Sequence, residues 1–247
     1  MNYYFAADVH LGLPPNAESR NRELCFVNWL DSIKPDAKEI FLLGDIFDFW
    51  FEYKKVVPRG FVRTMGKIAE LTDSGIPVHF FAGNHDLWVS DYLQSELGVI
   101  FHPTDYVANL YGHKFCLTHG DALNMTDKMH VLLRWIFTNR KLRKVFAGIH
   151  PYIGLSFAHA WSKSNRKKHG KMKFNPDDNP FYNKVCEIAK EQKLDFFVMG
   201  HLHSPVNLSA NGFNYIVLPD WLSGGGYAVF DGKTMEIKIF DYICAEF

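Results

Sequence analysis

Cysteine is scarce in this 247-residue chain. There are four, at positions far apart, and no two form a Cys-x-x-Cys pair: Cys25, Cys116, Cys186 and Cys244. This spacing argues against a disulfide framework and against a thiolate zinc site. It is typical of reduced core thiols in a reducing compartment.

Long apolar runs are also missing. No stretch of about 18 residues is apolar and free of charge, so no membrane-spanning helix is expected. Residues 1–8 contain no basic segment followed by an apolar run, so no secretory signal peptide is predicted. There is no internal repeat and no low-complexity tract. We therefore expect a cytoplasmic protein with a single domain over residues 1–247.

Acidic residues are absent from Lys128 to Pro176, where twelve lysines and arginines occur. The remaining 198 residues hold the other 15 basic side chains and all 27 acidic ones, so a formal net charge of zero hides a strong polarity. Such a polarity favours a localised anion-binding face. The alternative is an ordinary solvated surface whose aromatic residues only pack a helical segment onto the core.

Hydrophobic periodicity indicates alternating strands and helices. Strands are expected at Tyr3–Ala7, Glu39–Leu43, Pro77–Phe81, Val107–Leu110, Lys114–Thr118 and Leu194–Met199, and helices at Glu18–Ile33 and Phe61–Asp73. Turn signals at Asn211-Gly212 and Asp231-Gly232 predict C-terminal hairpins. Helical pattern dominates from Asp127 to about Lys193. The pattern therefore predicts a layered α/β fold with a helical lid insertion at about 122–183.

Five short polar motifs follow predicted strands. They are Asp8-Val9-His10, Gly44-Asp45-Ile46-Phe47-Asp48, Gly83-Asn84-His85-Asp86, His119-Gly120-Asp121 and Gly200-His201-Leu202-His203. Each alone could be an ordinary turn or a packed histidine. Together they bring carboxylate, amide and imidazole groups to the strand ends, where α/β sheets place their sites. The set therefore predicts a shared site.

Oxygen and imidazole ligands without thiolate suit two divalent metal ions, with Mn²⁺ favoured and Fe, Zn²⁺ or Mg²⁺ as alternatives. Two cations about 3.5–4 Å apart can share a carboxylate and favour in-line displacement at phosphorus. The predicted chemistry is therefore hydrolysis of a phosphate ester or anhydride.

Taken together, the five motifs resemble those of the calcineurin-like metallophosphoesterase superfamily over Asp8–His203. The resemblance implies a four-layer αββα sandwich with the site above two sheets. It implies that one metal is bound by Asp8, His10, Asp45 and His203, and the second by Asp45, Asn84, His119 and His201. Asp45 would bridge the two ions.

The resemblance also implies roles beyond ligation. His85 would protonate the leaving oxygen or stabilise the transition state, with Asp45 and Asn84 as the other catalytic residues. Asp48 and Asp121 would orient the ligands, although a capping or turn role fits either residue nearly as well.

Within the superfamily, the chain most resembles the UDP-2,3-diacylglucosamine pyrophosphatases of lipid A biosynthesis. The resemblance is carried by residues 44–50, by His119–Leu123 with Thr126-Asp127, and by the basic insertion. These enzymes release UMP and a lipid monophosphate, 2,3-diacylglucosamine 1-phosphate (lipid X). The implied substrate-binding residues are Asn84, Asp127, Ser164, Lys167, Lys168 and Lys171. His85 stands where that family commonly has Arg.

The insertion fits this function from its residues as well. Apolar side chains such as Trp135, Val145 and Trp161 interleave with the twelve cations. Such a lid can hold acyl chains and pyrophosphate, or lie on an anionic membrane. We therefore expect a nucleotide-linked lipid substrate and peripheral association with the inner face of the bacterial inner membrane. No nucleic acid and no obligate protein partner are expected.

Two other functions compete with this one. A nuclease or nucleotide phosphodiesterase could use the same metals and stack bases on the lid aromatics. A non-enzymatic scaffold could keep the fold without metals, but it would be expected to lack some of the ligand histidines.

Overall fold

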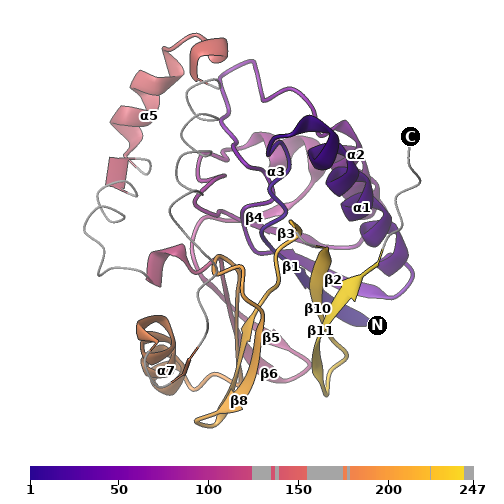
Figure 1. Cartoon of the computed structure of the whole chain (residues 1–247), viewed down its shortest axis with the longest axis vertical. Coiled ribbons are helices and arrows are strands. Elements are labelled where there is room, and N and C mark those ends of the chain that lie inside the picture. Colours follow the sequence, from indigo (N-terminus) through magenta and orange to yellow (C-terminus); the bar gives the residue numbers. More distant parts are fainter. Residues whose placement is uncertain (124–134, 137–138, 155–174, 177–178, 223, 242–247) are drawn as a thin grey trace.

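The structure is a computed structural model that describes residues 1–123, 135–136, 139–154, 175–176, 179–222 and 224–241. Two sheets form its centre (Figure 1). The first has strand order β11-β10-β1-β2-β3-β4 and the second β5-β6-β7-β9-β8. Strands β1 to β4 are parallel to one another, and so are β6, β7 and β9. The site-bearing strands of each sheet therefore end at a common edge.

The strands of the first sheet are β1 (Asn2–Ala6), β2 (Ala37–Leu42), β3 (Val78–Phe81), β4 (Ile100–His102), β10 (Gly225–Phe230) and β11 (Met235–Phe240). Those of the second are β5 (Tyr106–Leu110), β6 (His113–Thr118), β7 (Phe196–Met199), β8 (Val206–Ala210) and β9 (Phe213–Val217). The helices are α1 (Asn16–Ile33), α2 (Val62–Asp73), α3 (Tyr92–Leu97), α5 (Arg140–Ala147) and α7 (Pro180–Gln192), with a 3₁₀ turn η1 (Asp121–Leu123).

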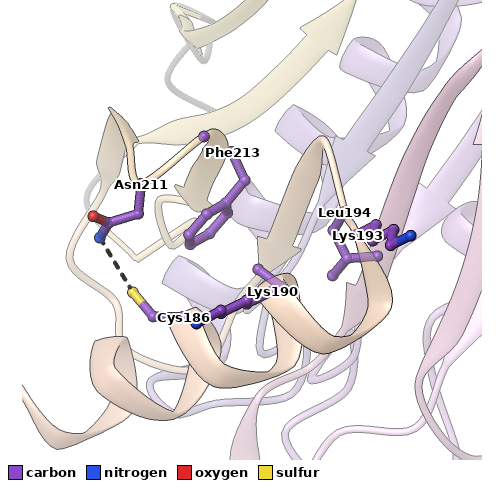
Figure 2. A pocket seen from close by; sticks show the side chains of 8 residues that line it. Cys186, Lys190, Lys193, Leu194, Asn211 and Phe213 are labelled. Carbon is purple, nitrogen blue, oxygen red and sulfur yellow. Dashed lines mark hydrogen bonds between the residues drawn. The ribbon is translucent and has the colours of Figure 1, made fainter.

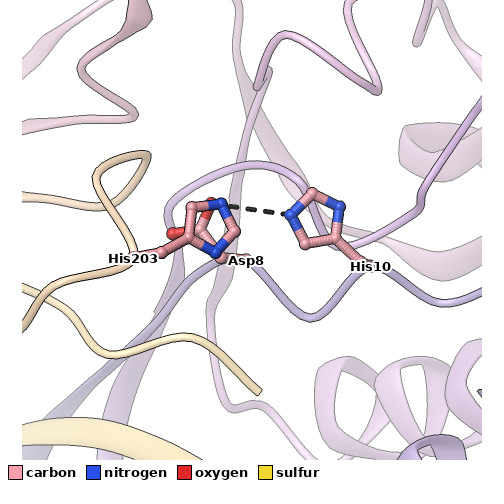
Figure 3. Close-up of side chains that lie close together, drawn as sticks. All are labelled: Asp8, His10 and His203. Carbon is pink, nitrogen blue, oxygen red and sulfur yellow. Dashed lines mark ion pairs between the residues drawn. The ribbon is translucent and has the colours of Figure 1, made fainter. Parts of the chain in front are cut away.

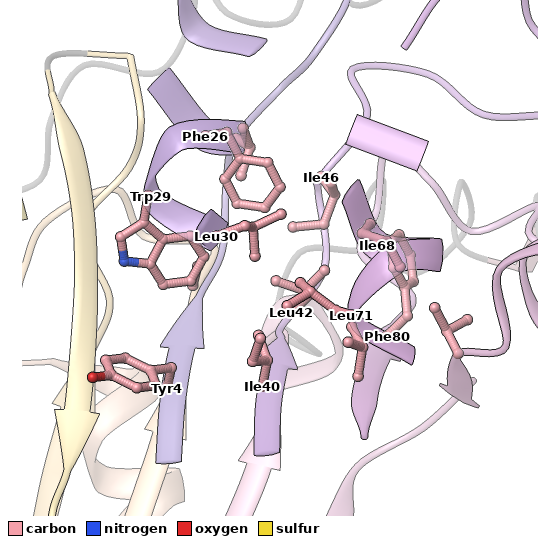
Figure 4. Packing of buried hydrophobic residues seen from close by; sticks show 14 of the residues in the cluster. Tyr4, Phe26, Trp29, Leu30, Ile40, Leu42, Ile46, Ile68, Leu71 and Phe80 are labelled. Carbon is pink, nitrogen blue, oxygen red and sulfur yellow. The ribbon is translucent and has the colours of Figure 1, made fainter. Parts of the chain in front are cut away.

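Three buried clusters hold the layers together. In the first, Phe26, Trp29 and Leu30 of α1 pack with residues of β1, β2 and α2 on one face of the first sheet (Figure 4). The second lies between the sheets, where odd-numbered residues such as Phe5 and Phe41 meet the second sheet, consistent with the two-residue period of strands. The third packs α7 on the other face of the second sheet. The described residues thus form the expected helix–sheet–sheet–helix sandwich.

Most predicted elements are confirmed within one or two residues. Helix α3 and strand β4 were not predicted, because at six and three residues they are too short to show a hydrophobic period. Of the predicted insertion at 122–183, the described part holds α5 and the start of α7. No helix among the described residues is long and apolar enough to cross a membrane.

Candidate metal centre

The predicted ligands all lie just after the carboxyl ends of strands. Asp8 and His10 follow β1, Asp45 follows β2, Asn84 follows β3, His119 follows β6, and His201 and His203 follow β7. The first two loops are tied side by side, because His10 N donates to Asp45 O at 2.9 Å and Asp48 N to Leu11 O at 2.8 Å. The loops after β6 and β7 are joined by Gly200 N, which donates to His119 O at 3.1 Å.

The backbone of these loops is unusual. Five of the seven predicted ligands have left-handed φ values between +50° and +69°: Asp8, His10, Asp45, His201 and His203. This conformation is uncommon for residues with a side chain and costs of order 1 kcal/mol or more each. It persists here because neighbouring loops fix it through hydrogen bonds.

Two motif glycines allow the loops to approach. A Cβ on Gly83 would collide with the Asp45 backbone and carboxylate, and a Cβ on Gly200 would lie 2.7 Å from Asp8 Oδ2. Any larger residue would push a carboxylate out of the cleft. This steric need explains why glycine precedes the ligand in these motifs.

The first predicted ligand set comes together around Asp8 (Figure 3). His203 Nε2 lies 3.6 Å from Asp8 Oδ1, and His10 Nε2 lies 4.0 Å from the same oxygen. All three groups converge although His203 is nearly 200 residues from Asp8 in sequence. Asp8 and His10 are buried, while the His203 side chain is 30% exposed.

The second predicted set surrounds His119. Its Nε2 lies 3.4 Å from Asp45 Oδ2 and 3.1 Å from Asn84 Oδ1, and the His201 ring centroid is 5.1 Å from the His119 ring. Asp45 Oδ2 is also 3.9 Å from His10 Nε2. Asp45 therefore stands between the two sets, in the position that a bridging ligand needs.

The carboxylates are oriented to leave one oxygen for a cation. Asp8 Oδ2 accepts a hydrogen bond from His201 N at 2.8 Å, and Asp45 Oδ1 accepts one from His85 N at 2.8 Å. Among the described residues, buried Asp8 Oδ1 and both ring nitrogens of His10 have no hydrogen-bond partner. Buried polar atoms are rarely left so. This donor set therefore fits divalent metal ions.

Other contacts orient the imidazoles. His119 Nδ1 lies 2.9 Å from Leu43 O, and His203 Nδ1 lies 3.2 Å from Asp220 Oδ2. A ring that donates through Nδ1 keeps a lone pair on Nε2 for a metal. His10 Nδ1 is 3.4 Å from Asp48 Oδ1, which places Asp48 where an orienting group belongs.

The electrostatics of the cleft favour ionised Asp45. Burial by itself would raise its pKa, but the charges of His119 and His85 hold it well below its usual value. Burial opposes charge on His119 too, yet Asp45 and Asp8 raise its pKa to about 9. Burial lowers the pKa of His10. The metal-free cleft thus carries a carboxylate–imidazolium pair where two ions would bind.

Sequence reasoning gave no role to Asp86, the last residue of the third motif. This fully buried carboxylate accepts backbone hydrogen bonds from Gly83, Asp45, Ile46 and Phe47 at 2.6–3.4 Å. Burial and the nearby charge of Asp45 raise its pKa to about 7. Asp86 therefore ties two ligand loops together, and its place in the motif was the available signal.

Asp220 was also missed, since it belongs to none of the five motifs. It is buried beside His203, between β9 and β10. Only its position three residues after a strand that ends at the same edge could have indicated it.

The other predicted site residues divide into two groups. His85 is in the cleft, with Nδ1 2.9 Å from Asp48 O and its ring at a right angle to His10, 4.9 Å away. Asp121 is buried at the start of η1. The remaining substrate-binding residues lie outside the described part of the chain: Asp127, Ser164, Lys167, Lys168 and Lys171.

A separate hollow lies between α7 and the β8–β9 hairpin (Figure 2). It is lined by Cys186, Lys190, Lys193 and Phe213, among others. None of the predicted site residues that the structure describes lines it. The hollow is therefore distinct from the metal cleft.

The fold and the cleft are those of a phosphoesterase that uses metal ions, and the similarity to known proteins agrees with this class. Residues 1–205 match the calcineurin-like phosphoesterase family, and the chain belongs to that family. It is a metal-dependent hydrolase.

Two relatives illustrate the nearer similarity. The chain is 36% identical to a UDP-2,3-diacylglucosamine hydrolase of Porphyromonas gingivalis, over 95% of this chain and 96% of the relative. It is 31% identical to a UDP-2,3-diacylglucosamine hydrolase of Actinobacillus succinogenes, over 88% and 91%.

Proposed function

We propose that this enzyme hydrolyses the pyrophosphate bond of UDP-2,3-diacylglucosamine, releasing UMP and 2,3-diacylglucosamine 1-phosphate. The observation that carries the proposal is 36% identity to a hydrolase of that name along 95% of the chain. The cleft supports it, since a pyrophosphate is a substrate for which paired cations and an imidazole are suited.

The metal ligands are proposed to be Asp8, His10, Asp45 and His203 for one ion, and Asp45, Asn84, His119 and His201 for the other. Mn²⁺ is proposed because the donors are oxygens and imidazoles without thiolate. When bound, such a pair of ions supplies Lewis acidity and lowers the pKa of water.

Residues of the chain would then position the groups that take part in the reaction. Asp45 Oδ1 is fixed by His85 N, which keeps Oδ2 between the imidazoles of His10 and His119. His85 donates Nδ1–H to Asp48 O, so Nε2 is the nitrogen that would serve the leaving oxygen. Because its side chain is 20% exposed, His85 can meet a substrate. We propose it as the general acid.

Helix α5 supports recognition of the lipid part. Its Phe146 ring packs 4.7 Å from the rings of Phe51 and Trp88, and Arg143 Nη2 donates to Trp88 O at 3.2 Å. Trp88 is only three residues from His85. Helix α5 is thus anchored beside the catalytic loop, and we propose that the insertion to which it belongs holds acyl chains.

The outer side of this region supports contact with an anionic membrane. Val145, Tyr152 and Ile153 are 68%, 75% and 60% exposed, and Lys141 and Lys144 are exposed beside them. Apolar side chains next to cations are typical of segments that lie in a lipid interface. We propose peripheral association with the cytoplasmic face of the inner membrane.

The decisive experiment incubates the purified protein with Mn²⁺ and UDP-2,3-diacylglucosamine and measures UMP. Release of UMP that stops on chelation is expected. Cleavage of oligonucleotides with no UMP release would indicate the nuclease alternative. Absence of bound metal after reconstitution would indicate a scaffold.

A second experiment tests lid recognition. Lys168→Ala with Lys171→Ala should raise KM or lower kcat/KM for the lipid nucleotide, because a lysine can follow phosphate charge without fixed geometry. Turnover of a small chromogenic phosphodiester should barely change. Equal loss on both substrates would show that these lysines support the fold or the metals instead.

A further inference from the structure

We infer that Asp220 is a positioning residue of the metal centre: its carboxylate sets the Nδ1–H tautomer of His203 and aims His203 Nε2 at the ion beside Asp8. The inference rests on the proposed ligand set. Asp220 lies beyond residues 1–205, which match the family, and outside all five sequence motifs.

The topology explains how Asp220 reaches the site. β9 is parallel to β7 and hydrogen-bonded to it, so both strands end at the cleft edge. His203 follows β7 and Asp220 follows β9, and Leu218 N donates to Met199 O at 2.7 Å between the two strand ends. A carboxylate three residues after β9 therefore falls beside an imidazole four residues after β7.

The Asp220 carboxylate is itself held in place. It is 8% exposed; Leu222 N donates to Oδ1 at 3.1 Å, and Oδ2 lies 3.2 Å from His203 Nδ1. With one oxygen fixed by backbone, the other has a defined direction toward the ring. A carboxylate that accepts Nδ1–H makes Nε2 both available and more basic, which strengthens a metal ligand.

The same loop also holds Asp8. Trp221 N donates to Asp8 O at 3.2 Å, and the buried Trp221 ring packs edge-on against Phe26 and Trp29 of α1, at 5.0 and 5.4 Å. Beneath the loop, a Cβ on Gly226 would collide with Pro219. The loop is thus anchored in the core and touches two of the four proposed ligands of one ion.

The test compares Asp220→Asn and Asp220→Ala with wild-type protein by titrating the metal-free forms with Mn²⁺. We expect the affinity for one of the two ions to fall by about 10- to 100-fold, the usual effect of removing a partner of a ligating histidine. The other ion should be retained with a smaller change. An unfolding transition, measured in the presence of chelator, shows whether each metal-free variant is folded.

Asp36→Asn is the matched control. Asp36 is a carboxylate that accepts from Asn2 and Tyr4 at the opposite end of the first sheet. This variant should bind both ions as wild type does. Unchanged affinity for both ions in the two Asp220 variants, or an equal loss in the control, would overturn the inference.

A measurement without metal separates this inference from the proposed function. Nitrogen NMR of the metal-free protein, at a pH where the ring is neutral, should show His203 with its proton on Nδ1. Asp220→Ala should shift the ring toward the Nε2–H form. If wild type fails to bind two ions, the proposed site is wrong, and the tautomer still tests Asp220. An unchanged tautomer in Asp220→Ala would refute the role of Asp220.

Discussion

Two groups of histidines in the described part of the chain differ in the atoms that surround their rings. In the metal cleft, the Nε2 atoms of His10 and His203 lie 3.6–4.0 Å from carboxylate oxygens, and among the described residues Asp8 Oδ1 and both ring nitrogens of His10 have no hydrogen-bond partner. In the second group, His79 Nδ1 lies 2.9 Å from His102 Nε2, and His79 Nε2 lies 3.1 Å from Glu39 Oε2. The second group forms a closed hydrogen-bonded row on β2, β3 and β4.

The two groups show how candidate metal ligands differ from packed histidines. Each hydrogen bond in the row pairs a donor with an acceptor, and the two rings stack on Phe41, Phe81 and Tyr106. The cleft instead keeps unsatisfied atoms buried, which costs free energy unless a ligand compensates. Spare coordinating atoms at strand ends therefore mark the site, whereas histidine content does not.

The largest expected effect is that of Asp45→Asn. Because Asp45 stands between both ligand sets, its loss should weaken the binding of both ions. It should lower kcat at least about 10³-fold, which corresponds to a rise of about 4 kcal/mol in the activation free energy. Steady-state UMP release measures it. Glu39→Gln, the matched change in the second group, should leave kcat unchanged. More than about a tenth of wild-type kcat in Asp45→Asn would contradict the assignment.

For His85→Ala we expect a loss of rate without a loss of metal. If His85 acts as the acid outside the ligand set, the variant should keep both metals and slow the chemical step by roughly 10²–10⁴-fold. Metal analysis and single-turnover rates check the two parts separately. His102→Ala, which removes a histidine from the second group, should not affect the rate. Loss of metal in His85→Ala would instead make His85 a ligand.

The affinity of the cleft for metal ions should depend on pH, because His119 is protonated in the metal-free protein. Below its pKa of about 9, His119 of the metal-free protein holds a proton, which it must lose before Nε2 can bind an ion. Apparent affinity should therefore fall by up to about tenfold per unit as pH drops from 9. Calorimetric titration in buffers of different ionisation enthalpy counts the released proton. Equal affinity at pH 7 and 8.5, without proton release, would contradict this.

The smallest expected effect concerns stability in acid. Burial lowers the pKa of His79 to about 4, and burial with the neighbouring His79 does the same for His102. Unfolded histidines take up protons near pH 6.5, so this contribution to stability is complete above 6.5 and declines as pH falls toward 4.

His79→Phe combined with His102→Phe should remove that decline. In chelator, we expect the difference in the free energy of unfolding between pH 7 and 4.5 to shrink by about 1–2 kcal/mol, allowing for solvent screening of a partly exposed pair. Urea denaturation at both pH values measures it. An unchanged difference would mean that other groups cause the acid sensitivity.

Much of this protein is determined locally by its sequence. The short apolar runs of strands such as β2 and β6 predicted these strands, and the Asn211-Gly212 turn signal predicted the hairpin of β8 and β9. Five polar motifs after strands pointed to one edge, because carboxyl ends of parallel strands meet there. The side chains of the two proposed ligand sets, around Asp8 and around His119, were therefore named from the sequence, whereas Asp220 was not.

Tertiary structure decided the rest, because the deciding contacts join residues far apart in the chain. The left-handed backbone at Asp8, His10 and Asp45 arises from hydrogen bonds between loops, which local propensity opposes. The choice of Nε2 over Nδ1 on His203 depends on Asp220, whose nearness follows from the pairing of β7 with β9. Motif spacing specifies which side chains reach the edge, but packing alone selects which of their atoms face the metals.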